Sequence, residues 1–137
     1  MFALKLARAA GLKIVLSSSS DQKLRAVCKQ FPNPPILTVN YANNPEWHED
    51  VLGHTNGIGV DLVLENGGPS TLLRSMKCTR RGGVISQVGY LDRKEFDGIT
   101  ELLPTLIDRR IVLRYGIIVI QVAISRLTTY QRYQCRI

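Results

Sequence analysis

The stretch Gly59–Tyr90 constrains what this chain can fold into more than any other segment. Its near-continuous apolar run over Val60–Leu64 is typical of a parallel strand that is covered on both faces. The following Asn66-Gly67-Gly68-Pro69 predicts that the strand stops and a helix starts, since proline is favoured at the first helical position. We expect Gly82-Gly83 to end that helix and Val84–Gly89 to form the next strand. Because parallel strands need a crossover connection, the stretch predicts one complete βαβ unit.

Further helices and strands are predicted on both sides of this unit. Ser20 is a favoured N-cap and predicts a helix over Asp21–Gln30, while Asn44-Pro45 predicts the start of another helix. The other expected elements are a helix over Phe2–Ala10, a helix with Pro104 in its first turn, strands over Lys13–Ser17 and Ile36–Val39, and one last strand formed by Ile111–Leu113 and Gly116–Val119. This alternation favours an α/β fold with a doubly wound parallel sheet.

The predicted core comes from apolar side chains that recur at helical spacing. We expect the following residues to face inward from four helices: Leu24 with Val27 or Cys28; Trp47 and Val51; Leu72, Leu73 and Met76; and Leu103, Leu106 and Ile107. Arg74, Lys77, Arg80 and Arg81 are expected to point away from the core.

The net charge of +7 is unevenly distributed along the chain. Residues 1–108 contain 12 Lys/Arg and 11 Asp/Glu, whereas residues 109–137 contain six arginines and no acid. The first part therefore has a balanced globular surface, and the basicity belongs to the tail. Cys28, Cys78 and Cys135 form no CxxC pair and predict neither a zinc knuckle nor a disulfide framework, so we expect a reducing, cytoplasmic setting. No apolar run reaches the ~18–20 residues that span a bilayer, so no membrane partner is expected.

Four segments in order resemble the nucleotide-binding half of the medium-chain, zinc-type alcohol dehydrogenase superfamily, in particular its quinone-reductase-like and NADPH-dependent members. They are FALKLARAAGLKIVLSSSSDQKL, TVNY, PEWHEDVLGHTNGIGVDLVLENGGPSTLLRSMKCTRRGGVISQVGYL and, more weakly, LLPTLIDRRIVLRYGIIV. The resemblance implies a partial, Rossmann-like dinucleotide-binding domain over residues 1–119. We expect an irregular basic tail over residues 120–137.

By resemblance, the family's first strand and its glycine-rich, phosphate-binding turn come immediately before Phe2, and a catalytic domain precedes them. We therefore expect a Rossmann-like sheet that lacks its first strand. In the order 3-2-1-4-5-6 this strand is central, so the strands on either side of it either close up or keep open edges, through which the chain could self-associate.

The first candidate cofactor-binding group follows the second strand of the family fold. Ser18, Ser19 and Lys23 lie where NAD-preferring enzymes place an acid for the ribose hydroxyls. Hydroxyls and a lysine suit a 2′-phosphate that an acid would repel, so the resemblance favours NADP over NAD, with Tyr41 on the adenosine side. The alternative is that Ser20 caps a helix and Lys23 is only solvated.

The second candidate group lies at later strand ends, outside which such sheets bind ligands. By resemblance, Asn66 and Gly67 border the adenine, and Val88, Gly89 and Tyr90 meet the nicotinamide ribose. Gly116, Ile117 and Ile118 resemble the segment that orients the carboxamide. The alternative is that the glycines only permit tight turns, which explains Gly82-Gly83 better than Gly67 or Gly89.

The sequence offers no convincing catalytic or metal-binding residue. His48 and His54 are six residues apart, do not share a helix face and are expected at the surface, so we expect zinc not to be bound by this chain. Ser86 lacks a triad partner, and Cys78 is expected to be a small core residue. The cofactor would carry the hydride chemistry.

Together these features predict a fragment of an NAD(P)H-dependent oxidoreductase that transfers hydride to or from an alcohol, aldehyde, ketone or enone. We expect the chain alone to be inactive and to bind its dinucleotide weakly if at all. The alternative is a non-catalytic interaction or nucleic-acid-binding module that uses the basic tail or the open sheet edges. Nucleic acid is disfavoured, because an abrupt end to the resemblance near Val119 suggests a shifted reading frame or mispredicted end.

Overall fold

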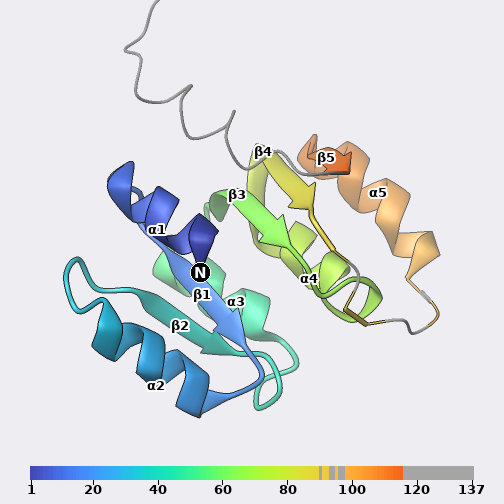
Figure 1. The fold of residues 1–137 in the computed structure, drawn as a ribbon. Helices are drawn as coiled ribbons and strands as arrows, with labels where there is room; N and C mark the ends of the chain where they lie inside the picture. The colour runs from blue at the N-terminus through green and yellow to red at the C-terminus, as the bar shows by residue number, and fades with distance from the viewer. Residues whose placement is uncertain (90, 93–94, 96–97, 116–137) are drawn as a thin grey trace, which may run out of the picture. The chain divides into compact units, whose positions relative to one another are not determined.

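The structure is a computed structural model that describes residues 1–89, 91–92, 95 and 98–115 (Figure 1). The described chain falls into two units, one containing Met1–Ile14 and one beginning at Val15. The first unit contributes helix α1 (Phe2–Ala9), and Gly11 follows it with a φ of +67°. This left-handed backbone is why a glycine suits the end of the helix, as predicted.

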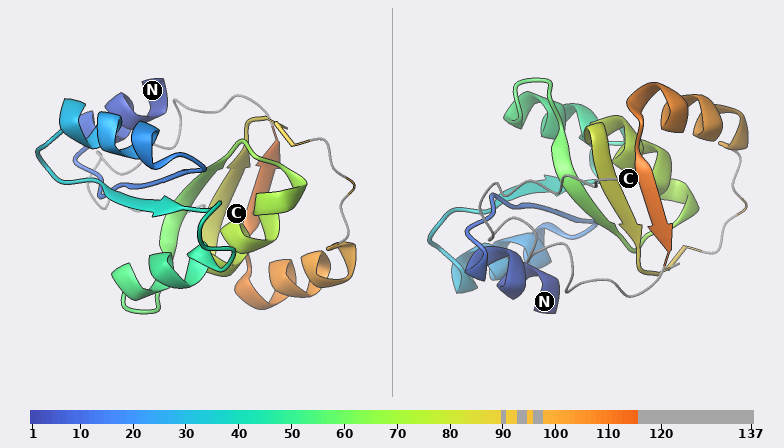
Figure 2. Two further views of the ribbon diagram at one scale, coloured as in Figure 1. Left: turned by 90° about the horizontal axis from the view of Figure 1, so that it is seen from below. Right: turned by 90° about the horizontal axis from the view of Figure 1, so that it is seen from above.

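The second unit begins with a two-stranded parallel sheet. Strand β1 (Val15–Ser18) pairs with β2 (Leu37–Asn40), and helix α2 (Asp21–Gln30) connects them. The hydroxyl oxygen of Ser20 accepts a hydrogen bond from the Lys23 N–H at 3.4 Å, so the predicted N-cap is confirmed. Figure 2 shows α2 and the following helix α3 (Trp47–His54) on opposite sides of this sheet, as in a doubly wound fold.

A three-stranded parallel sheet follows. Its strands β3 (Val60–Glu65), β4 (Thr79–Gln87) and β5 (Val112–Tyr115) are neighbours in sequence order, with α4 (Pro69–Cys78) and α5 (Ile99–Arg109) as the connections. Figure 2 shows α3, α4 and α5 along the same side of this sheet. The predicted α/β fold with parallel strands is therefore confirmed.

Two apolar clusters hold the second unit together. Val39 of β2 and Trp47 and Val51 of α3 pack with Cys78 at the end of α4. The second cluster joins α4, β4 and the start of β5 through Leu72, Met76, Ile85 and Ile111. The predicted inward faces of α3 and α4 are thus confirmed, because each helix buries the stripe that sequence periodicity indicated.

The predicted end of α4 is wrong. The helix stops at Cys78, and β4 begins at the next residue and passes through Gly82-Gly83. Between the paired positions Val60–Thr79 and Leu62–Val84, β4 contains three more residues than β3, so this segment forms an enlarged β-bulge. Glycines serve both helix ends and bulges, and only the pairing with β3 distinguishes the two.

The predicted inward face of α5 is confirmed at Leu106 and wrong at Leu103 and Ile107. Leu103 and Ile107 are 62% and 67% exposed, whereas Leu102 and Leu106 pack against the second cluster. Pro104 lies inside the helix rather than in its first turn. Two neighbouring apolar stripes run along this helix, and only contacts with α4 and β4 decide which is buried.

The two sheets are not joined through β1 and β3, so within the described residues these facing edges stay unpaired. Accordingly Leu64 of β3 is 39% exposed, and the expectation that β3 is covered on both faces is wrong at this residue. The order β2-β1 and β3-β4-β5 is the one expected of a doubly wound sheet whose central strand is not among these elements. In the described part of the chain, no helix is long and apolar enough to cross a bilayer.

Candidate functional site

The structure brings together the two turns that follow β3 and β4. The Val88 N–H donates to the Glu65 carbonyl at 2.8 Å, and the Leu91 N–H donates to the Asn66 carbonyl at 3.0 Å. The Asp92 N–H donates to the Gly67 carbonyl at 2.8 Å. The predicted residues Asn66, Gly67, Val88 and Gly89 therefore form one continuous rim at the carboxyl edge of the β3–β5 sheet.

Gly67 and Gly89 lie in close contact with neighbouring side chains and do not have a left-handed backbone. A Cβ added to Gly89 would overlap Oδ1 of Asn66, and a Cβ added to Gly67 would overlap the Thr71 hydroxyl. Neither glycine is among the residues with positive φ. The simple alternative of tight-turn glycines therefore does not account for these two positions.

A buried carboxylate, which sequence reasoning missed, organises this rim. Glu65 is 4% exposed. Its Oε1 accepts hydrogen bonds from the Gly67 N–H at 2.7 Å, the Gly68 N–H at 3.3 Å and the Thr71 hydroxyl at 2.8 Å. The Ser75 hydroxyl donates to the other oxygen, Oε2. The signal in the sequence was an acid ending an apolar strand, followed by hydroxyl residues on the next helix.

Glu65 has two effects on the site. Its negative charge lies at the amino end of α4, which the helix dipole favours. It also occupies the first N–H groups of the turn, which a helix N-terminus would otherwise offer to a phosphate. At this rim a ligand would therefore meet exposed edges and side chains rather than a ring of N–H donors.

The other predicted group lies at the carboxyl edge of the β1–β2 sheet. Ser18 pairs with Asn40, and the Tyr41 N–H donates to the Ser18 carbonyl at 3.2 Å. The Ser18 hydroxyl oxygen accepts from the Ser20 N–H at 3.2 Å, whereas Ser19 and Lys23 are exposed. The structure thus brings Ser18 and Tyr41 together, and the side chains of Ser19 and Lys23 are exposed to solvent.

Asp21 is an acidic residue near this edge that sequence reasoning missed. The Asp21 carboxylate accepts from the Asn40 side-chain amide at 2.7 Å and from the Asn43 amide at 3.2 Å. These neutral partners orient the carboxylate without cancelling its charge. Asp21 therefore adds a negative charge close to the serines that were expected to meet a 2′-phosphate.

Four predicted site residues lie outside the described residues. They are Tyr90, expected at the nicotinamide ribose, and Gly116, Ile117 and Ile118, expected at the carboxamide.

His48 does not lie at the surface as predicted. Its side chain is buried, and this burial lowers the pKa of the imidazole below its ordinary value, only partly opposed by Glu46. Glu46, His48 and Glu49 could each direct one ligand atom toward a common point. Arg74, however, donates to Glu46 at 3.3 Å, and the group lies at the positive end of α3. Both features weaken the attraction of the two carboxylates for a divalent cation.

The two candidate nucleophiles are buried. Burial raises the pKa of the Cys78 thiol from 9.0 to about 12, so the thiol stays neutral near pH 7 and the predicted core role is confirmed. The Ser86 hydroxyl has no hydrogen-bond partner within the described residues, so no base there activates it.

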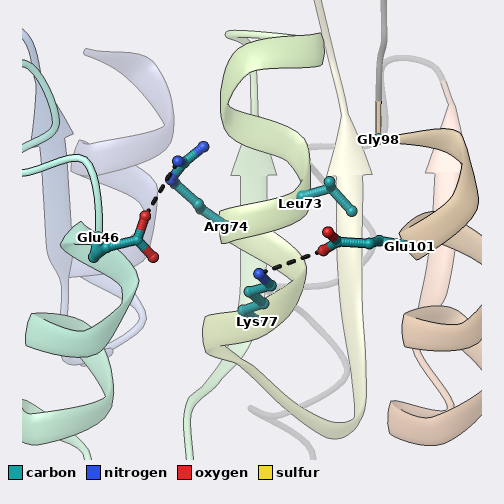
Figure 3. Close-up of a pocket in the computed structure, with 6 residues that line it drawn as sticks. All are labelled: Glu46, Leu73, Arg74, Lys77, Gly98 and Glu101. Atoms are coloured by element: carbon teal, nitrogen blue, oxygen red, sulfur yellow. Dashed lines mark hydrogen bonds and ion pairs between the residues drawn. The ribbon is translucent and has the colours of Figure 1, made fainter.

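A pocket of about 280 Å³ lies along α4 and is lined by side chains of α4 and by residues that begin α3 and α5. Figure 3 shows its two ion pairs: Arg74 reaches Glu46 at 3.3 Å, and Lys77 reaches Glu101 of α5 at 3.5 Å. Because all four side chains are substantially exposed, these pairs add little stability. They link α4 to its neighbours and satisfy one another's charge.

A family model and a curated relative match most of this chain. Residues 1–129 match the family model described as zinc-binding dehydrogenase. A zinc-type alcohol dehydrogenase-like protein of Schizosaccharomyces pombe is 35% identical over 126 residues, which are 91% of this chain and 35% of that protein.

Solved structures show the same fold. A Sinorhizobium meliloti protein assigned as an alcohol dehydrogenase aligns with a TM-score of 0.70 and 28% identity, over 92% of this chain and 35% of that one. The Escherichia coli quinone oxidoreductase, solved in complex with NADPH, aligns with a TM-score of 0.66 and 22% identity, over 81% of this chain and 32% of that one. The chain therefore spans about a third of the length of these relatives.

Proposed function

The chain belongs to the zinc-binding dehydrogenase family, and we propose that it supplies part of the dinucleotide-binding domain of an NAD(P)H-dependent oxidoreductase. The observation that carries this proposal is the joined rim after β3 and β4, where Asn66, Gly67 and Gly89 pack closely around the Glu65 network. Ligands of doubly wound sheets bind outside such strand ends.

Each part of the two rims has a role in this proposal. Ser19 and Lys23 hold the 2′-phosphate of NADP, since they are exposed at the end of β1, and Ser18 shapes that turn. Tyr41 packs beside the adenosine. Asn66 and Gly67 border the adenine, and Val88 and Gly89 contact the nicotinamide ribose. The proposal also retains Tyr90 at that ribose and Gly116, Ile117 and Ile118 at the carboxamide.

The reaction we propose is hydride transfer to or from an alcohol, aldehyde, ketone or enone. When bound, the dinucleotide supplies the hydride, and the protein binds and orients it. The rim residues lack an evident general acid or base, so we infer that the chain alone has no turnover. In this proposal residues 1–119 form the dinucleotide-binding part and residues 120–137 a basic tail.

Backbone amide NMR of the chain titrated with adenosine 2′,5′-bisphosphate tests the cofactor assignment. This probe carries the 2′-phosphate that distinguishes NADP. We expect shifts at Ser19, Lys23 and Tyr41, with a smaller response to 5′-AMP, and Lys23→Gln should abolish the difference between the two probes. A response to neither probe, or equal responses from the unchanged chain, would contradict the NADP-binding proposal.

A further inference from the structure

A pocket of about 550 Å³ lies at the amino edge of the β3–β5 sheet. Its lining comes from three segments: the turn before β3, the first part of β4 and the end of α5 (Figure 1). The lining residues are Gly57, Ile58, Arg80, Arg81, Asp108 and Arg109. The candidate cofactor rim lies at the opposite ends of the same strands, roughly 20 Å away along a six-residue strand. The pocket is therefore separate from that rim.

The bulge in β4 explains how two consecutive arginines reach one pocket. In a regular strand, Arg80 and Arg81 would point to opposite faces. The extra residues of the bulge break this alternation. Gly82 has a φ of +70°, and a Cβ on Gly83 would collide with Thr79, so both glycines are needed for this backbone. The segment that was mistaken for a helix end thus directs two guanidinium groups to one place.

The pocket keeps a positive charge after its ion pairs are counted. Arg80 donates through Nε to Asp61 at 2.6 Å, and Arg81 donates through Nη2 to Asp108 at 3.1 Å. Arg109 donates through Nη1 to the Thr79 carbonyl at 3.0 Å, which carries no formal charge. Three guanidinium groups therefore face two carboxylates.

These arginines can still bind a ligand. In the described part of the chain, Arg80 donates through Nε and Nη1, and Arg109 donates through Nη1. Nη2 of Arg80, and Nε and Nη2 of Arg109, can therefore donate hydrogen bonds to a ligand. The Arg81–Asp108 pair is mostly exposed, so a multivalent anion can replace the carboxylate at little cost. Ile58 lines the mouth of the arginine pocket, is 66% exposed and offers an apolar contact beside the charged groups.

We propose that this arginine pocket binds a small anion carrying two or more phosphate groups, independently of the dinucleotide. A guanidinium fork matches two oxygens of a phosphate and is the preferred partner for such groups. A ligand with two linked phosphates can engage arginines from β4 and from α5 together, which a single carboxylate cannot do.

Isothermal titration of the 137-residue chain with sodium pyrophosphate tests this proposal. We expect binding that weakens as salt is added, since the guanidinium groups remain partly exposed. Arg81→Gln and Arg109→Gln should each weaken binding about tenfold, because each removes a charge-assisted hydrogen bond. Arg25→Gln, which removes an exposed arginine from α2, should change the affinity less than twofold.

Two further comparisons make the test decisive. Arg109 also binds the Thr79 carbonyl, so if Arg109→Gln fails to fold by circular dichroism, Arg81→Gln carries the result. Lys23→Gln at the cofactor rim should leave pyrophosphate binding unchanged. The proposal is wrong if the unchanged chain releases no heat, if Arg25→Gln weakens binding as much as Arg81→Gln, or if Lys23→Gln does so.

Discussion

The two edges of the β3–β5 sheet come from one βαβ unit, yet they use backbone and charge in different ways. At the carboxyl edge, the buried Glu65 takes up the N–H groups of Gly67 and Gly68, and two glycines let the turns pack closely. At the amino edge, a bulge places Arg80 and Arg81 on a half-exposed pocket. At the first edge, the Glu65 carboxylate and the N–H and O–H groups around it satisfy one another. The second has charged groups that can exchange partners.

Of the substitutions considered for this unit, we expect that of Glu65 to lower the free energy of unfolding most. Glu65→Ala would leave the N–H groups of Gly67 and Gly68 and the Ser75 hydroxyl without an acceptor, at a cost of about 3 kcal/mol or more in the free energy of unfolding. Urea unfolding measures the change, with the exposed Glu95→Gln as the control. A cost as small as the control's would show that the carboxyl edge does not depend on this carboxylate.

The next effect concerns the two rim glycines. Gly67→Ala should destabilise the chain by about 2 kcal/mol, because the added Cβ overlaps Thr71, which Glu65 holds in place. Gly89→Ala should cost less, since its Cβ meets the end of the exposed Asn66 side chain, which can turn away. Thermal unfolding of both variants checks the order. If Gly89→Ala costs more, close packing is tighter at Asn66 than at the Glu65 network.

Cys78 lies buried just before the bulge and reports on the amino edge. Because its pKa is raised from 9.0 to about 12, the folded state binds the thiol proton more tightly than the unfolded state does. Stability from this group is therefore complete below pH 9 and falls as pH rises from 9 toward 12, by about 1.4 kcal/mol at pH 10. Urea unfolding between pH 8 and 10 measures the slope, and Cys78→Ala should remove it. An unchanged slope in Cys78→Ala would contradict the assignment.

The smallest predicted effect lies away from both edges, at His48. Burial lowers the pKa of this imidazole, so its stabilising contribution is present above pH 6.5 and is lost as pH falls through the lowered folded-state value. Unfolding experiments between pH 7 and 5 should show a loss that His48→Gln reduces. The exposed His54→Gln is the matched control and should leave the pH dependence unchanged.

Local signals in the sequence placed much of the fold correctly. Ser20 and Pro69 mark the observed starts of α2 and α4, because a cap and a first-turn proline act within a few residues of the chain. The strand-end turns at Asn66-Gly67 and Val88-Gly89 were also predicted, and the structure brings them together. Whether they bind a dinucleotide stays a proposal.

The sequence by itself therefore determined the family, the βαβ alternation and the apolar stripes of α3 and α4. Tertiary structure alone decided that Gly82-Gly83 forms a bulge, that Leu102 rather than Leu103 packs against the core, and that Glu65 and His48 lie inside. The physical reason is that these choices depend on partners distant in sequence. A bulge is defined only by the pairing of β4 with β3. A polar side chain is buried only where other parts of the chain supply hydrogen-bond partners or apolar neighbours that cover it.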